Sequence, residues 1–132
     1  TPFVGSAVAK LWGNPGSVNK LLNGTGSPLD AAGQAQYLAL VRDAGHVTGT
    51  LGMMAQWRLE GLMARLPSLT TPALLIASTR DAGVPPTISK VAALVMPDAR
   101  YAELPGYGHL VHEEAATAVT DVMLPWLADR LA

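Results

Sequence analysis

The sequence contains no cysteine, few aromatic residues and no long hydrophobic run, and each absence removes a class of protein. Without cysteine there is no disulfide framework, no cysteine-ligated zinc site and no thiol nucleophile, and a reducing compartment is compatible with the chain. Its longest apolar runs, such as Ala73 to Ala77 and Val91 to Met96, are far shorter than the ~18 residues of a membrane-spanning helix. We therefore expect a cytoplasmic protein.

The chain also lacks an excess of charge of either sign. The 132 residues carry 9 Lys and Arg against 10 Asp and Glu, a formal net charge of −1, and no basic cluster is present. Such a chain does not neutralise a phosphate backbone, so a nucleic-acid partner is not expected. The hydrophobic content of 49% instead predicts a folded domain with a modest core.

The first zone of the chain, about residues 1–67, has helical patterning and no convincing strand. Ser27 is expected to cap a helix that runs to about Arg42, with Pro28 in its first turn and Asp30 at the reciprocal capping position. Further helices are expected over about residues 47–59 and 60–66.

The second zone, residues 68–132, alternates strands and helices. We expect a buried strand at 72–78, a helix opened by Pro85 and Pro86, a second strand at 100–104 and a final helix from Glu113. This order predicts an α/β fold with a parallel β-α-β-α unit.

Two chemically distinctive residues follow the two predicted strands. Asp81 lies in the loop after the first strand, and His109 lies in the loop after the second. Because neighbouring parallel strands lie about 4.8 Å apart, side chains just beyond their carboxyl ends can form a hydrogen bond. A carboxylate that accepts from one imidazole nitrogen leaves the other nitrogen free as a base. Gly106 and Gly108 would allow the tight turn that presents His109.

Alternative interpretations remain for these residues. Asp81 could be an ordinary turn aspartate, and His109 a turn histidine. Asp98 is a rival acid, although its turn precedes the second strand rather than following one. His112, with His109 and the neighbouring glutamates, could suggest a metal site, but an acid–base histidine cannot also be a ligand, so no metal is expected.

The two loops resemble those of the α/β-hydrolase superfamily. Thr79-Arg-Asp81-Ala-Gly-Val-Pro85 is similar to its acid loop, although Ser78 stands where many members have glycine, and Leu104-Pro-Gly-Tyr-Gly-His109 is similar to its histidine loop. The resemblance implies a Ser-His-Asp triad, with residues 1–67 as a helical cap and 68–132 as the C-terminal part of the core. No Gly-x-Ser-x-Gly motif occurs in the chain, so we expect the nucleophile in a missing N-terminal half.

A narrower resemblance is to the magnesium-chelatase accessory proteins of bacteriochlorophyll synthesis, a pathway that supplies the pigment of photosynthesis. It rests on five motifs, which are Leu22-Asn-Gly-Thr-Gly-Ser27, Asp30-Ala-Ala-Gly33, Gly45-His-Val47, Leu51-Gly-Met-Met-Ala-Gln-Trp57 and His109-Leu-Val-His112-Glu-Glu114. The resemblance implies magnesium chelatase as a partner and a location at the periphery of the photosynthetic membrane. No cofactor is expected.

The apolar patch of Met53, Met54 and Trp57 could bind an apolar substrate such as a flat tetrapyrrole, or could simply pack the cap on the core. Two functions follow. The full-length protein could hydrolyse an ester or similar bond in an apolar substrate, in which case this fragment alone is inactive. The alternative is a non-enzymatic accessory that binds porphyrin or the chelatase.

Overall fold

The computed structural model describes residues 2–131, and these residues fall into two compact units. The first unit comprises the chain up to Asn23 together with Leu29–Arg58. The second comprises Gly24–Pro28 together with the chain from Leu59 onward. The short segment Gly24–Pro28 therefore belongs to the second unit, although the helices on both sides of it in the sequence belong to the first.

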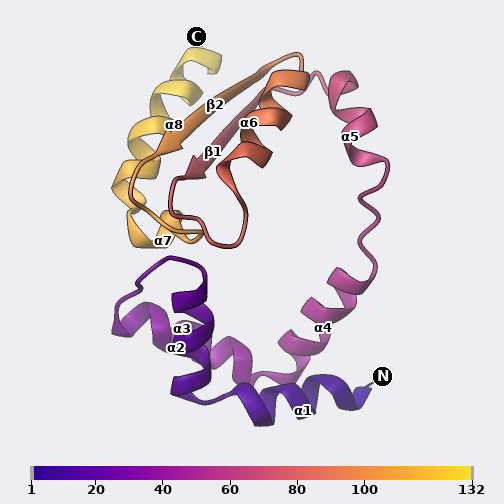
Figure 1. The fold of residues 1–132 in the computed structure, drawn as a ribbon, viewed down its shortest axis with the longest axis vertical. Coiled ribbons are helices and arrows are strands. Elements are labelled where there is room, and N and C mark those ends of the chain that lie inside the picture. Colours follow the sequence, from indigo (N-terminus) through magenta and orange to yellow (C-terminus); the bar gives the residue numbers. More distant parts are fainter. Residues whose placement is uncertain (1, 132) are drawn as a thin grey trace. The chain divides into compact units, whose positions relative to one another are not determined.

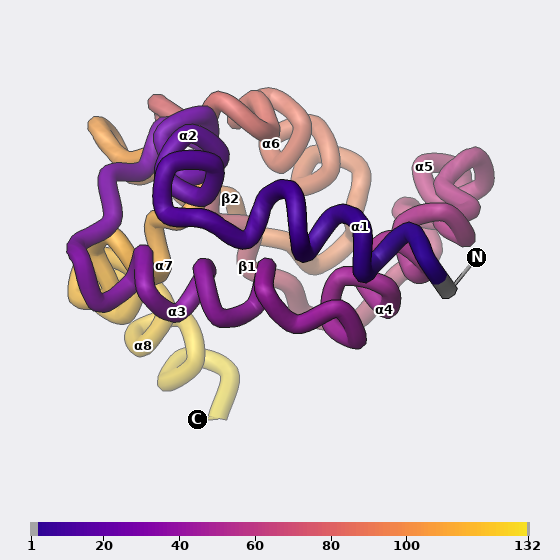
Figure 2. Tube along the Cα trace, turned by 90° about the horizontal axis from the view of Figure 1, so that it is seen from below, coloured from indigo at the N-terminus to yellow at the C-terminus, as the bar shows by residue number. Residues whose placement is uncertain are grey.

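The described part of the first unit is helical, as the sequence predicts. Its helices are α1 (Pro2–Trp12), α2 (Pro15–Gly24), α3 (Ala31–Arg42) and α4 (Ala44–Ala55). Helix α1 packs against α3 and α4, and its course along them can be followed in Figure 2. The buried apolar residues of this unit are Val18 and Leu22, one turn apart on α2, and Val47 on α4.

Short polar side chains set the ends of the helices in this unit. The carboxylate of Asp30 accepts a hydrogen bond from Gly33 N at 2.8 Å and so caps α3. The expectation that Ser27 caps this helix is wrong, because Ser27 is fully buried in the second unit. Asp43 ends α3 and begins α4, where its Oδ1 accepts from Gly45 N at 2.7 Å and from His46 N at 3.0 Å.

The second unit contains the alternating strands and helices that the sequence predicts. After α5 (Leu62–Arg65) and a 3₁₀ turn at Leu66–Ser68, its elements are β1 (Ala73–Ser78), α6 (Pro86–Val95), β2 (Ala99–Leu104), α7 (Val111–Glu114) and α8 (Ala116–Leu131). Figure 1 shows α6 on one side of the two strands and α8 on the other, and both helices contact both strands. This unit is therefore an α/β layer structure.

The two strands are parallel and in a register that runs from Ala73 opposite Ala99 to Ser78 opposite Leu104. Because both strands end at the same level, the loops that follow them leave the sheet side by side. The buried residues Ala77 and Leu104 lie at this end of the strands, directly below those loops. The register thus brings together the two loops that carry Asp81 and His109.

The final helix differs from the single element expected from Glu113 onward. A short helix, α7, ends at Glu114, and the backbone of Ala115 (φ −147°, ψ 59°) leaves the helical region before α8 begins. Within the described residues, no helix combines the length and the apolar character required to cross a membrane.

Candidate functional site

The loop after β1 holds Asp81 through its own backbone. Oδ1 of Asp81 accepts hydrogen bonds from Gly83 N at 2.8 Å and Val84 N at 2.7 Å, which is the turn role that an aspartate before a proline commonly takes. The other oxygen, Oδ2, is left for a different partner. The carboxylate is therefore anchored by one oxygen and available through the other.

His109 is that partner. Its Nδ1 lies 2.9 Å from Oδ2 of Asp81, across 28 residues of sequence. Since an ionised carboxylate can only accept, Nδ1 donates in this hydrogen bond, and in a neutral ring the lone pair is then on Nε2. The Asp81 side chain is 12% exposed and that of His109 is 42% exposed, so the imidazole is within reach of a small molecule.

The electrostatics of the pair favour an ionised carboxylate. Burial by itself would raise the pKa of Asp81, but the hydrogen bonds from Val84, His109 and Gly83 outweigh it and lower the pKa below its usual range. A carboxylate that stays charged is what orients a neutral imidazole and stabilises the imidazolium that forms when this ring accepts a proton.

Side-chain oxygens accept hydrogen bonds from two amides of the loop that carries His109. Thr79 Oγ1 accepts from Gly106 N at 2.8 Å, and Glu114 Oε2 accepts from Gly108 N at 2.9 Å. Gly106 has a φ of +86°, the left-handed conformation that glycine adopts most readily. Gly108 does not share this conformation: a Cβ there would overlap the backbone of Gly26, so it is close approach that requires glycine.

Residues Thr25, Gly26 and Ser27 also contact both loops, and the sequence reasoning missed them. Thr25 O accepts from Ala82 N and His109 N, and Ser27 Oγ accepts from Leu110 N. The Gly-Thr-Gly-Ser run signals a close backbone approach, but it contains no information on which distant loops it meets. We name residues 25–27 the bridging segment.

The other candidate residues lie elsewhere. Met53 and Met54 are in the last turn of α4 and Trp57 follows it, and their exposed fractions are 53%, 49% and 53%. They belong to the first unit, whereas Asp81 and His109 belong to the second.

The rival acid and the second histidine have other partners. Asp98 lies at the opposite end of the strands, as expected, and its carboxylate receives two hydrogen bonds from Arg130. His112 is on α7, with Nε2 3.4 Å from Oε1 of Glu113. No cluster of three or more His, Cys, Asp and Glu side chains suited to a metal ion occurs among residues 2–131.

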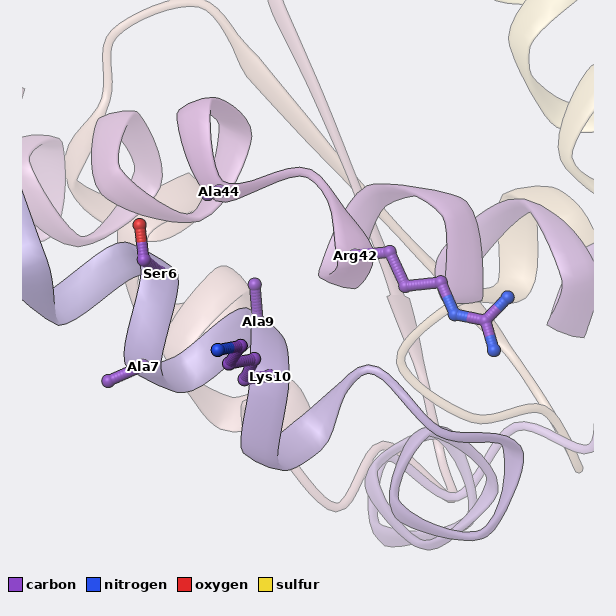
Figure 3. A pocket seen from close by; sticks show the side chains of 6 residues that line it. All are labelled: Ser6, Ala7, Ala9, Lys10, Arg42 and Ala44. Carbon is purple, nitrogen blue, oxygen red and sulfur yellow. The ribbon is translucent and has the colours of Figure 1, made fainter.

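A hollow of about 500 Å³ occurs in the first unit between α1 and the junction of α3 with α4. Figure 3 shows its small lining side chains, which include Ser6, Ala9 and Ala44. The guanidinium of Arg42 extends away from Ser6 (Figure 3), and its Nε donates to Gly13 O at 2.9 Å. None of the sequence-predicted site residues lines this hollow.

Comparison with known proteins finds a relative that matches most of the chain. No model of a known protein family matches the chain. The chain is 41% identical over 126 residues to a protein of Rhodobacter capsulatus named magnesium-chelatase 30 kDa subunit. The match covers 96% of this chain but only 44% of that protein. The chain is thus similar, along almost its whole length, to less than half of a protein named as a magnesium-chelatase subunit.

Proposed function

We propose that the chain is part of an α/β-hydrolase-fold protein that works with magnesium chelatase, with Asp81 and His109 as two members of a Ser-His-Asp triad. The observation that carries the catalytic part is the 2.9 Å contact between Nδ1 of His109 and an Asp81 carboxylate that two amides already anchor. In this proposal residues 1–67 act as the cap and residues 68–132 as part of the core.

The chemistry assigns one role to each residue. His109 Nε2 takes the proton of a serine hydroxyl as the oxygen attacks the carbonyl carbon, and returns that proton to the leaving group. Asp81 keeps the imidazole in the tautomer with the proton on Nδ1 and stabilises the transient imidazolium. The chain has no Gly-x-Ser-x-Gly motif, so the serine and the amides that stabilise the oxyanion come from outside these 132 residues.

An ester-hydrolysis assay tests the triad. In the protein as it occurs in the cell, His109→Ala and Asp81→Asn are each expected to lower kcat by about three to four powers of ten. The substrate is a series of p-nitrophenyl esters with apolar acyl chains, because an apolar substrate is expected.

His112→Ala is the matched control. His112 is a histidine three residues after His109, on α7, and its partner is Glu113 rather than Asp81. We expect it to hydrolyse esters at the unaltered rate. Equal rates for the unmodified protein and His109→Ala would exclude the triad.

A second candidate function is non-enzymatic, and the name of the relative, a magnesium-chelatase subunit, favours it. A chelatase-associated protein could hold the apolar porphyrin substrate of the chelatase through Met53, Met54 and Trp57, whose side chains are about half exposed. In this case a cytoplasmic location beside the photosynthetic membrane is also proposed.

Titration with protoporphyrin IX distinguishes this candidate. Porphyrin binding should quench tryptophan fluorescence, and the double change Met53→Ala and Met54→Ala should weaken binding by about tenfold or more, as expected for loss of apolar contact. Met63→Ala, which truncates a methionine of similar exposure on α5, is the control. Tight porphyrin binding without ester hydrolysis would favour this second function over the triad.

A further inference from the structure

The peptide groups next to Asp81 and His109 are hydrogen-bonded to a distant part of the sequence. Thr25 O accepts from Ala82 N, which belongs to the peptide group immediately after Asp81, at 3.2 Å. The same carbonyl accepts from His109 N at 3.1 Å. One carbonyl of the bridging segment therefore bonds to both loops.

Ser27 completes this arrangement on the other side of His109. Its Oγ accepts from Leu110 N at 2.8 Å, across 83 residues, and Ser27 is 0% exposed. The amide of His109 and the amide of Leu110 flank the Cα of His109, so both peptide groups of this residue are held by the bridging segment. A buried hydroxyl that satisfies a buried amide is costly to remove, because the amide is left without an acceptor.

Gly26 lies between the two loops at very close range. Its φ is +82°, and a Cβ there would overlap the carbonyl oxygen of Arg80 in the acid loop. On the histidine loop, Gly108 meets the backbone of Gly26 and Ser27 so closely that a Cβ at Gly108 would overlap it as well. The three backbones therefore pack together without intervening side chains, and a shift in one displaces the others.

We propose that the bridging segment, with Ser27 as its positioning residue, sets the separation of the Asp81 carboxylate and the His109 imidazole. The hydroxyl of Ser27 bonds to the amide of Leu110, so it acts through the backbone of the histidine loop. Because it is completely buried, it is a positioning group rather than a nucleophile. The inference rests on the proposed triad for its effect on activity, but the geometric part stands independently of it.

The first experiment uses the unmodified protein and needs no catalysis. If one segment holds both loops, hydrogen exchange at the amides of Ala82, His109 and Leu110 should report a common opening free energy, because opening the segment frees all three. Clearly different opening energies for these amides would overturn the proposal.

The second experiment changes Ser27. Ser27→Ala should lower kcat by about 10- to 100-fold with KM unchanged, the expected result of a misplaced base. It should also weaken the low-field Nδ1–H proton signal of His109 in NMR spectra, since that signal depends on the contact with Asp81. Ser27→Cys, which keeps the shape of the side chain with a somewhat larger atom but offers a weak acceptor, is the second variant and should give the same changes.

Ser78→Ala is the control, because Ser78 is also a buried serine, 2% exposed, in the same unit. It should leave the Nδ1–H signal and kcat unaltered. A folded Ser27 variant with the unmodified signal and kcat would overturn the proposal. If His109→Ala hydrolyses esters normally, the triad fails, whereas the exchange and NMR results still decide whether the segment positions His109.

Discussion

At the residue scale, two aspartates make the same backbone contacts but differ in one side-chain partner. Asp43 and Asp81 each accept with Oδ1 from the amides two and three residues ahead. Only Asp81 also receives a bond from a histidine ring. Asp43 is therefore a natural control for the part of the behaviour of Asp81 that comes from the turn alone.

We predict that Asp81→Asn lowers the free energy of unfolding by about 1–3 kcal/mol at neutral pH, because charge-assisted hydrogen bonds are weakened. The pKa of Asp81 is lower in the folded state, so its contribution is fully present above the unfolded value of about 4. The contribution disappears as the pH falls through the lower folded pKa. Urea unfolding at pH 7 and at about pH 3 measures the free energy of unfolding of Asp81→Asn and of the unmodified protein. The difference between these two free energies should shrink in acid.

Asp43→Asn should show the same sign of pH dependence, because hydrogen bonds from the amides of His46 and Gly45 lower its pKa as well. It should not alter the Nδ1–H signal of His109. A difference between Asp81→Asn and the unmodified protein that grows in acid would contradict the assigned direction.

The glycines of the histidine loop give a second prediction at this scale. Gly108→Ala should cost about 1–3 kcal/mol of unfolding free energy, because its Cβ meets backbone atoms that cannot rotate away. Gly106→Ala has open space but a φ of +86°, so it should cost about 1–2 kcal/mol through backbone strain.

Gly52→Ala in α4 is the control, since nothing lies near the added Cβ and alanine favours a helix by up to about 1 kcal/mol. Thermal unfolding of the three variants compares them. A Gly108→Ala protein as stable as the Gly52→Ala protein would contradict the close approach of residues 26 and 108.

At the element scale, the C-terminal end of α8 is held to the turn before β2. Arg130 donates to both oxygens of Asp98, with Nη1 at 2.7 Å from Oδ2, and its guanidinium lies 5.6 Å from the ring centre of Trp126. A planar guanidinium satisfies a two-point contact of this kind, whereas an ammonium does not.

We therefore predict that Arg130→Lys lowers Tm measurably, because lysine loses one of the two hydrogen bonds and the stacking on Trp126. Arg100→Lys is the control, as Arg100 makes only a 3.8 Å exposed contact with Asp129. Differential scanning calorimetry should give a lower Tm for Arg130→Lys than for Arg100→Lys. The reverse order would show that this contact does not hold the end of α8.

At the scale of the whole molecule, the second unit displays features that favour association. Its sheet, within the described residues, consists of β1 and β2 alone. Helix α6 carries exposed apolar side chains that include Ile88, Val91 and Leu94. Leu94 is the most exposed of them, at 78%. Unpaired strand edges and exposed apolar side chains both favour the binding of another chain.

We predict that the 132-residue chain, expressed alone, forms oligomers or aggregates that grow with concentration, and that it does not hydrolyse esters. Sedimentation velocity over a concentration series measures the association. Ile88→Lys with Leu94→Lys should reduce it, whereas Lys20→Ala, in the first unit, should not. A monomeric, cooperatively unfolding chain would contradict this prediction.

The sequence by itself determined the alternation of strands and helices in the second unit and the meeting of the two loops, although not the break between α7 and α8. Apolar runs of strand length, proline at the start of a helix and glycines beside His109 are local signals, and parallel pairing of β1 with β2 places Asp81 and His109 together. The role of these two residues, like that of Met53, Met54 and Trp57, stays a prediction.

Only the tertiary structure decided that Ser27 leaves its expected capping position, that Gly108 is required by contact with Gly26, and that Thr25 bonds to both loops. The physical reason is distance along the chain. A capping signal depends on neighbouring residues in the sequence. A buried hydroxyl instead bonds to an amide that folding brings near, which for Ser27 is the amide of Leu110, 83 residues away.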